Sequence, residues 1–155
     1  MECAPPNKID HIKKLIKMGV NSFSINLELY DEDIRKEVCP VKSEILRSSY
    51  EETWNYIVNA LGDYKVGSAL IVGLEPRKST LDGARYLLDQ KVLPNLLPFK
   101  PMPGSKYENR ETIDIKLYFE VCEKVSKMVA DCHIDREMRL GCTTCGACSM
   151  ELDSF

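Results

Sequence analysis

Hydrophobic and polar residues along the chain form blocks that predict helices separated by short strands. Four segments repeat apolar residues at the three- and four-residue spacing of an amphipathic helix: residues 8–18, about 48–61, about 79–88 and about 112–131. Three shorter runs rich in branched apolar residues predict strands: 22–29, 65–75 and 92–99. The predicted order is therefore α-β-α-β-α-β-α, with helix-length connections between the strands.

This alternation predicts an α/β fold in which parallel strands are joined by right-handed crossovers. The run 65–75 is almost continuously apolar, as in a strand buried on both faces. Pro94 and Pro98 must lie at the ends or edges of the strand predicted for the run 92–99. Residues 30–48 are polar and predict a loop with one helical turn near 32–37. An open doubly wound sheet and part of a barrel both satisfy this pattern.

Length and composition predict one cytoplasmic domain. The chain has 155 residues, of which 44% are apolar and 29% charged, as is usual for a globular domain. The net charge of −3 gives no electrostatic reason to expect binding to nucleic acid or an anionic membrane. The chain has no apolar run of the ~18–20 residues that a membrane span needs. Its start, MECAPPNKID, also lacks the basic-then-apolar order of a signal peptide.

Three of the seven cysteines form the sharpest motif. The stretch GCTTCGACS (141–149) places Cys142, Cys145 and Cys148 in a C-x2-C-x2-C spacing that brings three thiolates to one centre. In a reducing compartment such spacing favours metal over disulfides. An iron–sulfur cluster would take its fourth ligand from Cys132, Cys39 or a substrate, or would have none. Zinc could add Cys132 or His133, and a metal-free thiol cluster remains the third alternative.

The three predicted strand–loop units resemble a known family. SINLELYDEDIRKEVCP, ALIVGLEPRKSTLDGARYL and LLPFKPMPGS are similar, in order, to the last three units of radical S-adenosylmethionine enzymes of the biotin synthase and lipoyl synthase branch. The resemblance covers about residues 8–131. It implies a partial parallel (β/α) barrel of about three strands with four helices, the carboxyl-terminal half of a (β/α)6 barrel, with a site at the carboxyl ends of the strands.

The chain departs from the family in lacking its C-x3-C-x2-C motif, its first two strands and its glycine-rich element. The segment ECAPPNK, at residues 2–8, is similar to the end of a third strand that leads into its helix. We therefore expect residues 1–131 to form the partial barrel, with 132–155 as a cysteine-rich tail. The expected partner is the missing amino-terminal half, or a separate chain that carries C-x3-C-x2-C.

Asn26 and Glu28 are two residues apart in a predicted strand, so their side chains should share a face. A carboxylate and an amide suit the two hydroxyls of a ribose, although Glu28 pairing with a lysine and Asn26 closing a turn would explain them as well. The resemblance implies that they bind the ribose of S-adenosylmethionine. It also implies that Arg47 holds the methionine carboxylate, with Arg35 as the second candidate and a solvated arginine as the alternative.

Ile71 and Gly73 lie in the run 65–75, where a glycine and apolar side chains could approach a flat adenine. The same residues could simply form a buried strand. The resemblance implies adenine binding, with Leu97, Pro98 and Phe99 contributing to the same pocket.

The resemblance implies that, in the whole enzyme, a [4Fe-4S] cluster reduces S-adenosylmethionine to a 5′-deoxyadenosyl radical that takes hydrogen from an unreactive C–H bond. The centre at Cys142–Cys148 would donate sulfur to, or hold, a small-molecule or carrier-bound substrate. The chain alone is then expected to be inactive. The alternatives are a non-catalytic cluster- or zinc-binding subunit that completes a partner's barrel, and a small doubly wound domain with structural zinc.

Overall fold

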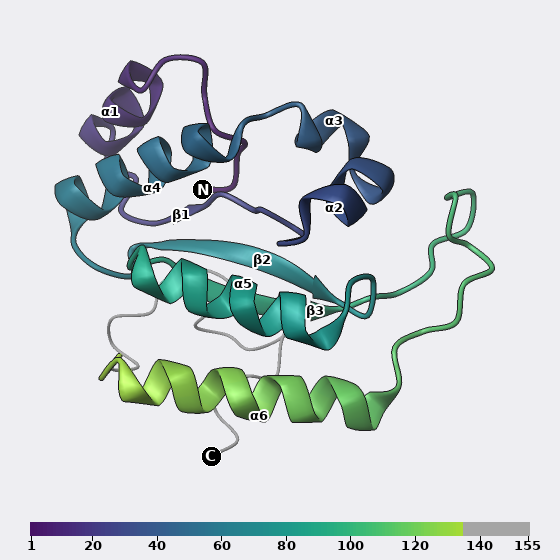
Figure 1. The fold of residues 1–155 in the computed structure, drawn as a ribbon. Coiled ribbons are helices and arrows are strands. Elements are labelled where there is room, and N and C mark those ends of the chain that lie inside the picture. The colour runs from purple at the N-terminus through teal and green to yellow at the C-terminus, as the bar shows by residue number, and fades with distance from the viewer. Residues whose placement is uncertain (135–155) are drawn as a thin grey trace.

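The computed structural model describes residues 1–134, and within them a parallel sheet of three strands is flanked by six helices (Figure 1). The strand order is β1-β2-β3, and both neighbouring pairs are parallel. The predicted α/β class with parallel strands is confirmed, and the described strands form an open sheet consistent with part of a barrel. The elements are α1 (Asp10–Lys17), β1 (Phe23–Ser24), α2 (Glu32–Val38), α3 (Pro40–Ser43), α4 (Arg47–Leu61), β2 (Val66–Val72), α5 (Arg77–Asp89), β3 (Leu93–Pro98) and α6 (Ile115–Asp131).

The strongest pairing joins β2 to β3, in a register that runs from Gly67↔Leu93 to Val72↔Pro98. Both prolines of β3 fall inside this ladder. They are tolerated because β3 pairs with β2 on one side only, among the described strands. This agrees with the prediction that the prolines lie at the ends or edges of the strand, because β3 is an edge strand among the described strands and Pro98 is its last residue.

The first predicted strand, 22–29, is interrupted by a bulge. Ser24 pairs with Gly67, whereas Glu28 forms an isolated bridge with Leu70, so one extra residue lies on the first strand. Side chains replace the backbone ladder between these points, since Ala69 N donates to Asn26 Oδ1 (3.0 Å) and Leu27 N donates to Ser68 Oγ (2.9 Å).

The first residues of the chain continue the sheet beyond β1. Glu2 forms a parallel bridge with Ser24, Cys3 N donates to Ser24 O (3.1 Å) and Ser24 N donates to Met1 O (2.7 Å). The segment then leads into α1. The structure thus has one parallel bridge followed by α1 where the sequence predicted the end of a strand that leads into a helix.

The main core lies between the sheet and helices α4, α5 and α6, which run alongside one another in Figure 1. Trp54, Leu70, Leu87, Leu96 and Val121 are completely buried there and come from α4, β2, α5, β3 and α6 in turn. Each helix contributes the apolar stripe that its periodicity predicted. Consecutive strands covered by consecutive helices form the arrangement of neighbouring units in a (β/α) barrel.

The loops at the carboxyl end of the sheet contain more structure than the sequence predicted. The segment 30–48 holds both α2 and α3, which Figure 1 shows beyond the end of β1. Asp31 caps α2, because its Oδ1 accepts from Asp33 N and Ile34 N (both 3.1 Å). A second, small apolar cluster of Leu29, Leu74 and Phe99 lies at this end. No helix in residues 1–134 has the length and apolar character needed to cross a bilayer.

Candidate functional site

Because the strands are parallel, their carboxyl ends and the loops that follow them gather at one edge of the sheet. Two of the predicted site residues stand at this edge in left-handed backbone conformations, Glu28 with φ of 71° and Gly73 with φ of 107°. A positive φ is unusual for glutamate and indicates a position that its surroundings hold strictly. Glu28 is held by its backbone, since its N donates to Ala69 O (2.9 Å) and its O accepts from Ile71 N (2.7 Å).

The Glu28 side chain forms a close ion pair with Lys42 of α3. The glutamate side chain is 15% exposed and the lysine side chain 38% exposed, so the pair is partly buried. The lysine pairing weighed as an alternative in the sequence is therefore present in the structure. It occupies Glu28 Oε1, and a carboxylate offers further acceptor positions on its other oxygen.

Asn26 closes the bulge rather than standing free. Its Oδ1 accepts from Ala69 N and from Ser24 Oγ (2.7 Å), and its Nδ2 donates to Glu2 Oε1 (2.8 Å). Asn26 and Glu28 both lie on the less buried side of the first strand, but they bond different partners. A ribose at Asn26 would have to share an amide that already fixes the strand.

Ile71 packs against the small cluster of Leu29, Leu74 and Phe99, and it pairs in register with Leu97. Next to it, Gly73 is approached closely by Ile113, whose Cβ lies 2.9 Å from the position that a glycine Cβ would take. The glycine is thus required by its positive φ and by this contact. Adenine binding by Ile71 and Gly73 stays a prediction.

Arg47 occupies a different hollow, at the start of α4. Its Nη2 donates to Tyr30 O (2.7 Å), its Nε donates to Glu32 Oε1 (3.2 Å), and its guanidinium lies 4.9 Å and 5.4 Å from the ring centroids of Tyr30 and Tyr86. Its Nη1 is buried without a hydrogen-bond partner. The hollow measures about 480 Å³ and is also lined by Ser79 and Asp82. Glu28 does not line it.

Arg35, the second candidate for the methionine carboxylate, is a buried brace that is only 4% exposed. Its Nε donates to Leu27 O (3.2 Å), and its Nη2 donates to Lys42 O (2.6 Å) and Tyr50 Oη (3.0 Å). It therefore ties the first strand, α3 and α4 together. These contacts satisfy the guanidinium within the fold.

Glu75 is a residue whose role the sequence did not reveal. It is 7% exposed, and its carboxylate accepts from Tyr30 N (3.0 Å), Asp31 N (2.9 Å) and Thr80 Oγ1 (3.1 Å). Burial raises the pKa of this carboxyl, and the three hydrogen bonds offset part of that rise. Glu75 joins the loop after β1 to the start of α5. The signal that could have found it is a glutamate directly after a buried strand.

Asn95 is the second residue that sequence reasoning missed. It pairs in register with Ala69 in the middle of β2 and β3, and its Oδ1 is buried without a hydrogen-bond partner. An unsatisfied buried amide oxygen costs about 1–3 kcal/mol, so Asn95 is a candidate for contact with a bound molecule. The sequence signal was an asparagine inside the apolar run 92–99.

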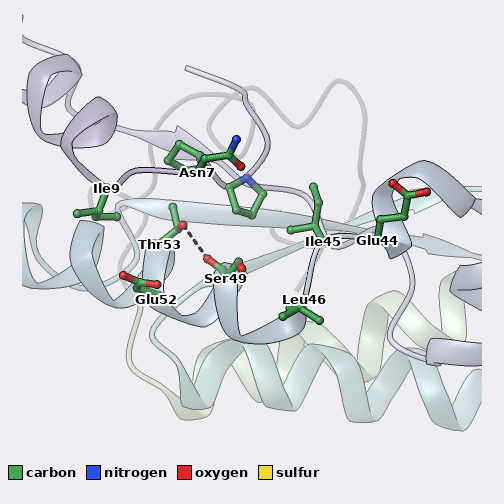
Figure 2. A pocket seen from close by; sticks show the side chains of 10 residues that line it. Asn7, Ile9, Glu44, Ile45, Leu46, Ser49, Glu52 and Thr53 are labelled. Carbon is green, nitrogen blue, oxygen red and sulfur yellow. Dashed lines mark hydrogen bonds between the residues drawn. The ribbon is translucent and has the colours of Figure 1, made fainter.

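A second hollow, of about 400 Å³, lies between the loop before α1 and the start of α4 (Figure 2). Figure 2 shows that it mixes apolar side chains with the carboxylates of Glu44 and Glu52. None of the residues that the sequence singled out for ligand binding lines it. Its lining residues are Pro5, Pro6, Asn7, Ile9, Glu44, Ile45, Leu46, Ser49, Glu52 and Thr53.

The predicted metal ligands Cys142, Cys145 and Cys148 lie outside the described residues. Within residues 1–134, no cluster of three or more histidine, cysteine or acidic side chains has an arrangement that could hold a metal ion. Of the suggested fourth ligands, Cys39 follows α2, and burial raises the pKa of its thiol. Cys132 and His133 follow α6. The choice between a cluster, zinc and no metal stays open.

Comparison with known proteins identifies one relative. The chain is 29% identical over 126 residues to bacteriochlorophyllide c C-7(1)-hydroxylase from Chlorobaculum limnaeum, a match that covers 80% of this chain and 31% of the relative. The chain thus spans about a third of the length of the relative that it matches. No family model matches the chain, and no solved structure matches it. The similarity is compatible with the resemblance to radical S-adenosylmethionine enzymes.

Proposed function

We propose that the chain is the carboxyl-terminal part of a radical S-adenosylmethionine enzyme and supplies one wall of the cofactor site. Glu28 would accept hydrogen bonds from the ribose, with Asn26 beside it, while Ile71 and Gly73 would contact the adenine. Arg47 is retained as the candidate for the methionine carboxylate. S-adenosylmethionine and a [4Fe-4S] cluster would supply the hydrogen-abstracting radical in the whole enzyme, and the residues of this chain would bind and orient the nucleoside.

The observation that carries this proposal is the position of Glu28 at the carboxyl end of a consecutive parallel sheet, the edge at which barrel enzymes place their sites. The partly buried carboxylate and the buried oxygen of Asn95 both suit a polar ligand. The contact between Gly73 and Ile113 limits how closely an adenine could approach that glycine. Adenine contact should therefore come mainly from Ile71 and its neighbour Leu97.

The relative's name favours hydroxylation among the possible reactions. That protein is named for hydroxylation of a bacteriochlorophyllide at one carbon, whereas the biotin and lipoyl synthase resemblance suggested sulfur insertion. Both reactions functionalise an unreactive C–H bond. We therefore propose C–H functionalisation as the reaction class, with hydroxylation of a large organic substrate as its first form and sulfur insertion as its second.

A second candidate function is a non-catalytic subunit that completes a partner's barrel and carries a cluster or zinc on Cys142, Cys145 and Cys148. The parallel bridge between Glu2 and Ser24 supports it, because the first residues of the chain extend the sheet beyond β1 and a partner's strand could pair next to them. Both functions place the C-x3-C-x2-C motif outside this chain. They differ in whether the chain itself contacts S-adenosylmethionine.

The test is equilibrium dialysis of labelled S-adenosylmethionine against the chain and its Glu28→Gln variant. A hydrogen bond to a charged group is worth about 1.5–3 kcal/mol, so Glu28→Gln should weaken binding by about tenfold or more. The control is Glu111→Gln, which changes an exposed glutamate in the loop before α6 and should leave binding unchanged. Equal binding by all three proteins would refute the ribose assignment, and no binding by any of them would favour the subunit function.

The metal proposal has a separate test. Iron, sulfide and zinc would be measured under anaerobic conditions in the wild type and in Cys145→Ala. Iron with matching sulfide, lost in the variant, supports a cluster at the cysteine motif. Zinc without sulfide supports a structural site, and equal metal content in both proteins excludes the motif as a ligand set.

A further inference from the structure

Lys42 is the charged group that contacts Glu28 directly. It belongs to α3, a helix of four residues that sits beyond the carboxyl end of β1. Its ammonium pairs with Glu28 Oε1. Within residues 1–134, no hydrogen bond or ion pair joins another side chain to this carboxylate. Lys42 is therefore the residue that bonds the carboxylate, and the Cys39 thiol also lies close enough to Glu28 to interact with it electrostatically.

The backbone of Lys42 is held in place by hydrogen bonds within the fold. Arg35 Nη2 donates to Lys42 O at 2.6 Å, and Arg35 also bonds Leu27 O, directly before Glu28. Ser43 Oγ donates to Pro40 O (2.7 Å) and closes the helix from the other side. One buried arginine thus locates both the backbone of Lys42 and the strand end that carries Glu28.

The pair offers a ligand a particular combination of groups. The carboxylate accepts hydrogen bonds, and the ammonium has three donors of which one is directed at the carboxylate. Their charges cancel, so a second cation gains little by approaching Glu28. A neutral group with adjacent hydroxyls, which both donate and accept, is the chemistry that fits a carboxylate and an ammonium side by side.

We infer that Lys42 is a positioning residue that orients the Glu28 carboxylate for a neutral vicinal diol. The inference rests on the proposed function, because it takes the ribose as that diol. It adds that ribose recognition belongs to the Glu28–Lys42 pair as a unit. It also assigns α3, which the sequence did not predict, a role in ligand selection.

The experiment compares two probes, adenosine and 2′,3′-dideoxyadenosine, which differ only in the diol. Their dissociation constants would be measured by isothermal titration calorimetry for the wild type, Lys42→Met, Lys42→Arg, Glu28→Gln and the double variant Lys42→Met/Glu28→Gln. Lys36→Met is the matched control, because Lys36 lies on neighbouring α2 and its side chain, 64% exposed, pairs with Asp33. Circular dichroism would confirm that each variant is folded.

The wild type and Lys36→Met should bind adenosine about tenfold or more tightly than the dideoxy probe. Lys42→Met should lose most of this preference, and Lys42→Arg should keep it. In the Glu28→Gln background, Lys42→Met should have no further effect, because the lysine acts through the carboxylate.

Other outcomes separate the two claims. Tighter adenosine binding by Lys42→Met would show that the lysine competes with the ligand, and would overturn its positioning role. A preference lost in Glu28→Gln but kept in Lys42→Met would also overturn that role while leaving the proposed function intact. A wild type that does not distinguish the probes would refute the ribose assignment, and the inference with it.

Discussion

The helix-covered face of the sheet and its carboxyl end are built on different principles. On the face, Trp54, Leu70 and Val121 are fully buried among other apolar groups. At the carboxyl end, Glu28 has a positive φ and forms an ion pair. Glu75 is buried there, and its carboxylate accepts hydrogen bonds from two backbone amides and a hydroxyl. The face gains stability from burial, which is non-directional. The end depends on individual polar contacts, so changes there should alter local geometry at smaller cost in stability.

Trp54→Ala should have the largest effect. Trp54 is completely buried, and its Nε1 donates to Ile25 O (3.2 Å). Its truncation should lower the free energy of unfolding by about 3–5 kcal/mol. The measurement is urea denaturation followed by circular dichroism. Tryptophan fluorescence cannot be used, because the variant lacks the only tryptophan of the chain. Trp54→Phe, which keeps most of the packing, should cost clearly less, and an equal cost would mean that packing does not dominate this face.

Arg35→Met should have the next largest effect, and it tests the hydrogen bonds by which Arg35 joins the first strand, α3 and α4. The variant leaves Leu27 O, Lys42 O and Tyr50 Oη without their donor, and should cost about 2–3 kcal/mol in unfolding free energy. Arg85→Met is the matched control, because Arg85 is exposed on α5, and should change stability by less than about 0.5 kcal/mol. Similar denaturation midpoints for both variants would contradict the role of Arg35.

Gly73→Ala tests the close contact between Gly73 and Ile113 at the carboxyl end of the sheet. It should lower the free energy of unfolding by about 1–3 kcal/mol. An alanine there would have a positive φ and would meet Ile113 at 2.9 Å. Gly104→Ala measures the cost of the positive φ alone, because Gly104 has φ of 79° and open space around it. It should cost less than Gly73→Ala in thermal or urea unfolding. Adding Ile113→Ala to Gly73→Ala should recover part of the difference, and no recovery would count against the steric explanation.

Glu75→Gln should have the smallest effect at neutral pH, within about 1 kcal/mol, and should act mainly on pH dependence. Because burial raises the pKa of Glu75 in the folded state, the native chain holds this proton more tightly than the unfolded chain. Unfolding free energy should therefore fall as pH rises from the ordinary glutamate pKa of about 4.3 through the raised value.

Glutamine cannot ionise, so the variant should show a flatter dependence. Urea denaturation of both proteins between about pH 4 and pH 7 gives the comparison. Parallel pH profiles would rule out Glu75 as the source of this slope.

The helix-covered face was largely predictable from the sequence. Periodicity placed the four longer helices, and the apolar run 65–75 became β2 (Val66–Val72). Parallel pairing followed from the alternation of helices and strands, and the placement of Pro94 and Pro98 at a strand end or edge followed from the missing N–H of proline. These features depend on the repeat of apolar residues, which is a property of the sequence itself.

The carboxyl end was less predictable, because its structure depends on contacts between distant residues. The bulge in the first strand lies where the side chains of Asn26 and Ser68, 42 positions apart, accept hydrogen bonds from the backbone of the opposite strand. The run 22–29 therefore looked like a regular strand. Lys42 and Arg47 lie in one polar segment, yet only Lys42 reaches Glu28. Sequence reasoning selected residue types suited to a site and could not say which of them meet.

The consecutive strand order also has a consequence for how the chain folds. Strands β2 and β3 are joined by α5 alone, so residues 66–98 form a unit whose contacts span a short stretch of chain. Short loops cost little entropy to close, and this unit should form early. The first strand must then dock across a longer connection and settle its bulge. The carboxyl end, where Glu28 meets Lys42, would be among the last parts to take shape.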